Sequence, residues 1–198
     1  MYELQTSVEV GGNEYRITND GDYRMVLDCF NVLNDEELND YERMIACAII
    51  FFVDFDSVDD LARLSSEEYT DLVNQMFLFF NCGEDKSSGM NMPYKLIDWE
   101  QDSQLIISAI NNVSGKEIRA ERYIHWWTFM GYYMAIGDCP LSNIVNIRHK
   151  IAKGKKLEKY ESEFRRDNPQ YFTWNSVSVQ QKADDEYIRQ LWNNGGEE

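Results

Sequence analysis

The stretch of sequence that decides the fold runs through LIDWEQDSQLIISAI (residues 96–110), YIHWWTFMGYYMAIGD (123–138) and CPLSNIVNIRHKIAKGKKLEKYESEF (139–164). Apolar side chains recur in these three segments at helical spacing, and the middle segment is apolar on every side. A helix of that kind is normally covered all round by other helices. This part of the chain therefore predicts a helical bundle around a central aromatic helix, and it carries no recognisable catalytic motif.

Helical patterns extend over most of the remaining chain. The predicted helices cover residues 22–33, 38–53, 57–64, 65–80, 99–113, 117–136, 140–152 and 155–167, with a weak one at 184–192. Capping residues, glycines and prolines mark their ends, and Pro140 suits the first turn of a helix. We therefore predict a mainly α fold, a bundle of about seven to eight helices.

The N-terminal segment has a different pattern. Residues 3–18 alternate polar and apolar side chains around Gly11-Gly12-Asn13, which is typical of a β-hairpin closed by a glycine-rich turn. A two-stranded hairpin is only marginally stable alone, so it must pack on the helices or add its edge to a neighbouring copy. We expect homo-oligomers on this ground.

The chain is long enough for one domain. Its 198 residues are 43% hydrophobic and supply a sizeable core, so we predict a single helical domain over residues 1–168. Residues 84–92 are predicted to form a mobile loop, and residues 169–198 a C-terminal extension. The longest apolar run, at 123–136, is shorter than the about 20 residues that a bilayer needs, so no membrane partner is expected. The four cysteines show no paired spacing and are expected to be reduced core residues of a cytoplasmic protein.

Charge is distributed unevenly along the chain. The net charge is −16, and residues 1–100 contain 22 acidic and 6 basic side chains, whereas residues 101–198 contain 13 of each. Phosphate binding needs a basic face, so nucleic acid is not expected as a partner. An acidic half and a balanced half with a basic stretch at 148–166 could steer head-to-tail self-association.

An acidic motif follows residues 49–53 (IIFFV) and raises an enzymatic alternative. Asp54 and Asp56 match the D-x-D-x-[TV] nucleophile motif of haloacid-dehalogenase phosphotransferases, in which the first carboxylate attacks phosphorus. Against this, the preceding apolar spacing is helical, and Asp184-Asp185 lies too near the C-terminus to complete an α/β sheet. The same loop lacks the glycine and glutamate of a calcium loop, since Asp59 and Ser65 stand there.

Metal and cofactor sites are not indicated. His125 and His149 have no ligand partner at helical spacing, and no phosphate-binding or dinucleotide-binding glycine motif occurs. We expect His125 to be a partly buried structural histidine. The sequence predicts no catalytic, cofactor-binding or metal-binding residues, and the protein is expected not to be an enzyme.

A family resemblance comes from three short patterns. They are TSVEVGGNEY at residues 6–15, LIDW at 96–99 with Asp102 and Ile106, and YIHWW at 123–127 before Gly131. Together they resemble the siphophage gene-product-fifteen family of tail assembly chaperones, over roughly residues 4–168. The resemblance implies a protein that holds the tape-measure protein soluble in the host cytoplasm until tail-tube subunits polymerise around it, and that is scarce in the mature virion.

On this resemblance the tape-measure protein is the expected client, and the tail-tube protein a further candidate partner. Apolar helix-in-groove contacts would bind such a client. The candidate partner-binding residues, each of which could equally belong to the core, are Phe77, Phe80, Trp126, Trp127, Tyr132 and Tyr133. The alternatives are a structural tail or head-completion protein of the virion and the phosphotransferase that uses Asp54 and Asp56.

Overall fold

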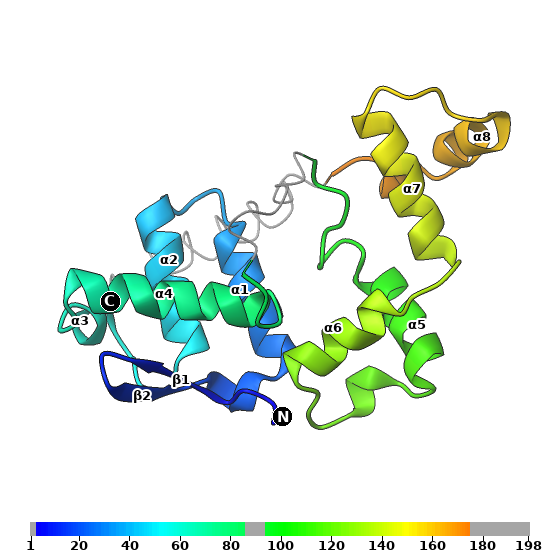
Figure 1. The fold of residues 1–198 in the computed structure, drawn as a ribbon. Helices are drawn as coiled ribbons and strands as arrows, with labels where there is room; N and C mark the ends of the chain where they lie inside the picture. Colours follow the sequence, from blue (N-terminus) through cyan, green and yellow to red (C-terminus); the bar gives the residue numbers. More distant parts are fainter. Residues whose placement is uncertain (1–2, 86–93, 175–198) are drawn as a thin grey trace, which may run out of the picture. The chain divides into compact units, whose positions relative to one another are not determined.

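A computed structural model describes residues 3–85 and 94–174 of the chain. These residues form eight α-helices and an N-terminal β-hairpin (Figure 1), so the prediction of a mainly α fold with a hairpin is confirmed. They fall into two compact units, one of residues 3–85 with 105–139 and the other of residues 94–104 with 140–174. The single domain over residues 1–168 stays a prediction. The predicted helix at 184–192 and most of the predicted loop at 84–92 lie outside the described residues.

The hairpin begins the first unit. Strands β1 (Ser7–Val10) and β2 (Asn13–Arg16) are antiparallel, and Val10 faces Asn13 across a two-residue turn. Gly11 and Gly12 in that turn have φ angles of +60° and +79°, which is the conformation that suits the twist of a tight hairpin. β1 buries Val8 and Val10 and packs on α4 (Ser66–Phe80). The hairpin therefore finds its support within the chain.

Helices build the rest of the first unit. They are α1 (Tyr23–Leu33), α2 (Asp40–Phe51), α3 (Val58–Leu61), α4, most of α5 (Ser103–Ser114) and α6 (Trp126–Met134). α1 and α2 pack side by side (Figure 1). Large aromatic side chains fill the core, among them Phe51, Phe52, Phe79, Trp126 and Phe129, each at most 1% exposed. Among the described residues, no helix is long and apolar enough to cross a bilayer.

The predicted helix over residues 117–136 is wrong in its first half. Only a 3-10 turn, η2 (Ile118–Ala120), and an extended segment precede α6. The Tyr23 N–H donates to the Ile124 carbonyl at 2.9 Å, and the Ile124 N–H donates to the Asp22 carboxylate at 2.9 Å. These bonds to the start of α1 hold the segment extended, so tertiary pairing overrides the helical pattern.

The second unit contains α7 (Pro140–Ala152), α8 (Lys159–Asp167) and η3 (Pro169–Tyr171). Its centre is the buried Arg148 guanidinium, which donates to both carboxylate oxygens of Asp102 at 2.6 and 2.9 Å. Arg148 also donates to the carbonyl oxygens of Leu96 and Tyr171, at 2.9 and 2.8 Å, and lies 4.3 Å from the ring centre of Trp174. Residues 169–174 therefore pack within this unit.

Candidate functional site

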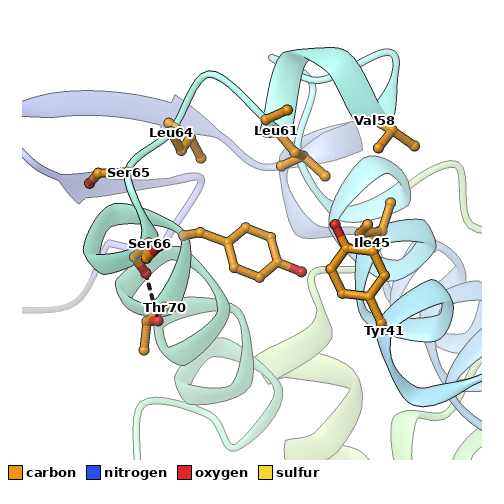
Figure 2. Close-up of a pocket in the computed structure, with 10 residues that line it drawn as sticks. Tyr41, Ile45, Val58, Leu61, Leu64, Ser65, Ser66 and Thr70 are labelled. Atoms are coloured by element: carbon orange, nitrogen blue, oxygen red, sulfur yellow. Dashed lines mark hydrogen bonds between the residues drawn. The ribbon is translucent and has the colours of Figure 1, made fainter.

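A pocket lies in the first unit where α2, α3 and the start of α4 meet. It encloses about 320 Å³. Figure 2 shows Tyr41 and Ile45 of α2 on one side, Ser66 and Thr70 of α4 on the other, and Val58 and Leu61 along α3. The full lining is Tyr41, Ile45, Val58, Leu61, Ala62, Leu64, Ser65, Ser66, Tyr69 and Thr70. A pocket of this volume admits a large side chain or a small ligand.

Local capping fixes the α4 side of the pocket. The Ser65 hydroxyl accepts from the Glu68 N–H at 3.2 Å, and the Glu68 carboxylate accepts from the Ser65 N–H at 2.8 Å, which is a capping box. The Thr70 hydroxyl donates to the Ser66 carbonyl at 2.7 Å (Figure 2). Because the helix start already has an internal carboxylate bound, it is not arranged to receive an anion.

Tyr69 gives the pocket its polar feature. Its hydroxyl oxygen is buried, and among the described residues it has no hydrogen-bond partner. Burial raises the pKa of the Tyr69 phenol, and the nearby Tyr41 phenol raises it further. A buried hydroxyl without a partner carries a desolvation cost of about 1–3 kcal/mol, so an occupant with a hydrogen-bonding group would be favoured here.

The surface around the pocket is apolar at the rim and acidic beyond it. Tyr41 and Val58 are 67% and 50% exposed. Residues 40–45 and 58–70, which contain the whole lining, carry six acidic and two basic side chains. An occupant with basic groups around an apolar anchor fits such a surface best.

The six candidate partner-binding aromatics divide by burial. Phe80 and Trp126 lie in the core at 6% and 1% exposure. Phe77, Trp127, Tyr132 and Tyr133 are half-buried. Of the six, these four therefore offer side-chain surface to a partner, and their role in partner binding stays a prediction.

Two of these residues close the end of α4. The Trp126 indole N–H donates to the Phe80 carbonyl, and the Trp127 indole N–H donates to the Phe79 carbonyl, both at 2.9 Å. The last carbonyls of a helix have no partner within its regular hydrogen-bond pattern. The Trp126 indole pairs with the Phe80 carbonyl, and the Trp127 indole adds a second donor to the Phe79 carbonyl, which also accepts from the Cys82 N–H at 3.0 Å. Trp126 and Trp127 thus have a structural role that their sequence pattern does not reveal.

His125 lies at the start of α6, where its ring is buried. Its Nδ1 accepts from the Trp127 N–H at 3.1 Å, so its Nε2 carries the proton and donates to the Gln5 carbonyl at 2.9 Å. Burial lowers the pKa of the imidazole, more than the Gln5 carbonyl and Asp22 raise it. Both ring nitrogens are occupied by backbone groups, which is the geometry of a structural cap.

The acidic motif lies in a loop that follows α2. Asp54 accepts from the Arg16 N–H at 2.7 Å, and its carboxylate lies 3.7 Å from the Arg16 guanidinium. The Phe52 backbone pairs with Ile17 beside the hairpin. The motif therefore follows a helix, whereas a phosphotransferase nucleophile stands at the end of a parallel strand. Among the described residues, no group of three His, Cys, Asp or Glu side chains is placed to hold a metal ion.

The chain is similar to a known protein family. The family model described as Bacteriophage Gp15 protein matches residues 1–172. The chain belongs to this family. It is therefore a bacteriophage protein, and the predicted family resemblance is confirmed at that level. No curated protein and no solved structure matches the chain.

The pocket of this Gp15 family protein was not indicated by the sequence pattern either. Tyr41 and Ile45 fit an apolar stripe of a helix, and Tyr69 fits the first turns of another, so each reads as an ordinary core position. One signal was present: Tyr41 follows the acidic Asp40 within the first turn of α2, where side chains are commonly exposed. The empty space between the elements is a tertiary property.

Proposed function

We propose that this protein is a tail assembly chaperone that binds the tape-measure protein while the tail tube is built. The observation that carries the proposal is the family match over residues 1–172, together with the tail-assembly role implied by the resemblance. On this proposal the protein acts in the host cytoplasm by binding alone and is scarce in the finished particle.

The surface of the chain supports apolar client binding. Half-buried aromatics on α4 and α6, with Met134 at 71% exposure, provide adaptable side chains that can repack around an amphipathic helix. Shallow contacts of this type break readily, and the client must be released when the tube subunits arrive. The acidic charge keeps such a surface soluble.

Co-expression with the tape-measure protein tests the proposal. The soluble fraction of the tape-measure protein should rise with this chain, and the complex should persist in high salt because apolar contacts are not screened. Phe77→Ala and Tyr132→Ala should weaken the complex. The matched control is Val113→Ala on α5, which removes an exposed apolar side chain outside the predicted set.

Two results would contradict the proposal. A tape-measure protein that is equally soluble without this chain would remove the chaperone role. Stoichiometric amounts of the chain in purified particles, measured by mass spectrometry, would instead support a structural tail or head-completion protein.

A further inference from the structure

We propose that the pocket between α2, α3 and α4 binds Tyr160 from α8 of a second copy of this chain, so that copies join head to tail. The proposal does not depend on the tape-measure client. It rests on the chemistry of the pocket, on the presentation of Tyr160 and on the charges beside each.

Tyr160 lies on α8, and its hydroxyl donates to the neighbouring Glu161 carboxylate at 3.4 Å. The side chain is 68% exposed. The neighbouring Glu161 is buried, accepts from the Lys150 ammonium at 2.6 Å, and accepts from the Glu158 N–H at 2.8 Å at the start of α8. α8 is thereby fixed on α7, and an exposed tyrosine on a fixed helix loses little conformational freedom on binding.

The pocket and the phenol match in chemistry. The walls supplied by Tyr41, Ile45 and Leu61 suit an aromatic ring, and the buried Tyr69 hydroxyl has no partner among the described residues. A tyrosine hydroxyl both donates and accepts, so Tyr160 can satisfy the Tyr69 hydroxyl while its ring covers the apolar walls.

The charges next to the two surfaces are opposite. The segment that leads into Tyr160, residues 153–159, has four lysines and one glutamate, and the four lysines are exposed. The segments that form the pocket have six acidic and two basic side chains. Opposite charges speed the encounter of two proteins and decide which surfaces meet. The acidic segments around the pocket of one copy therefore attract the lysine-rich segment of another copy.

The contact is heterologous, because the pocket and the tyrosine are different surfaces of one chain. Every copy then offers one pocket and one tyrosine, and such contacts produce rings or open chains of copies. A substitution that removes one of the two surfaces leaves the other intact, so a mixture of two such variants tests the proposal.

The experiment uses two full-length variants in analytical ultracentrifugation. Tyr160→Ser removes the inserted ring, and Ala62→Lys blocks the pocket from the exposed position that follows α3, where a basic side chain is well tolerated. The matched controls are Val113→Ser, at another exposed apolar side chain, and Ala135→Lys, at the exposed alanine that follows α6. Circular dichroism is the check that all four variants fold.

The wild type and both controls should associate as concentration rises, and each test variant should remain at the monomer mass of 23.3 kDa. An equimolar mixture of the two test variants should form pairs and stop there, because only one pocket and one tyrosine remain usable. Raised salt should weaken the association, unlike binding of an apolar client. A wild type that stays monomeric, test variants that associate like the wild type, or a mixture that stays monomeric would overturn the proposal.

Discussion

Gly21 shows how a single residue is tied to distant parts of the first unit. Its φ angle is +79°, and a Cβ atom added there would lie 2.7 Å from Phe79 Cζ and 3.1 Å from His125 Nε2. Gly12 in the hairpin turn has the same φ angle, but a Cβ atom there would meet nothing within 4 Å. A side chain at Gly12 would therefore meet backbone strain alone, whereas a side chain at Gly21 would meet backbone strain and crowding.

We expect Gly21→Ala to destabilise the protein more than Gly12→Ala. The left-handed backbone costs about 1–2 kcal/mol at either position, and crowding against Phe79 adds about 1–3 kcal/mol at Gly21. Urea unfolding followed by circular dichroism measures both losses. Equal losses at the two sites would show that Phe79 and His125 move aside freely.

The two glycines also mark what sequence can reveal at this scale. The Gly11-Gly12 turn is predictable because its signal, two glycines between alternating strands, is local. Nothing local marks Gly21 as crowded, since the atoms that crowd it belong to α4 and to the cap of α6. Residue-level constraints of this second type come only from the folded chain.

At the scale of elements, α6 begins with a histidine cap that depends on protonation. The folded pKa of His125 lies below its ordinary value of 6.5. As pH falls through 6.5, the unfolded chain binds a proton that the folded chain resists, so stability decreases toward acid. The slope from this one group is at most about 1.4 kcal/mol per pH unit.

His125→Asn should remove this part of the pH dependence. Asparagine can accept from the Trp127 N–H as a cap but does not titrate, and it loses the bond to Gln5. The free energy of unfolding of the wild type should exceed that of the variant at pH 7.5, and the gap should narrow at pH 5.5. Comparing the two proteins cancels the titration of the carboxylates. A gap that is constant with pH would mean that His125 has the same pKa in the folded and the unfolded chain.

The helices themselves were predictable where their signals are local. α7 has the predicted bounds of 140–152, since Pro140 opens the helix and Gly154 follows its end. Residues 121–125 were predicted to be helical and are extended, because their backbone pairs with Asp22 and Tyr23 rather than with the next turn. Periodicity cannot show which backbone groups find partners far along the chain.

For the whole molecule, the position of the C-terminal boundary can be tested by truncation. Chain 1–174 keeps every described contact of Arg148, whereas chain 1–168 lacks the Tyr171 carbonyl and the Trp174 ring that lie against it. A buried guanidinium that loses partners is costly, so chain 1–168 should unfold at lower temperature than chain 1–174. Calorimetry of both chains measures this. Equal transition temperatures would show that residues 169–174 contribute nothing to the second unit.

The candidate site was only partly predictable at this scale. The acidic first half and the basic stretch were visible in composition, because charge needs no fold to be counted. The pocket was not visible, since Tyr41, Leu61 and Tyr69 come from three helices whose packing leaves the space between them. Phe80 and Trp126 were named as candidates and are core residues, because an aromatic pattern alone does not separate a covered face from an exposed one.

The bond between Asp22 and the Ile124 backbone has a consequence for synthesis on the ribosome. The two residues are 102 positions apart. At a synthesis rate of about 5–20 residues per second, roughly 5–20 s pass between the synthesis of Asp22 and that of Ile124. During that interval the nascent hairpin and the first four helices expose the apolar surfaces that α6 later covers. A protein proposed to protect another chain from aggregation is thus itself vulnerable for as long as its own translation lasts.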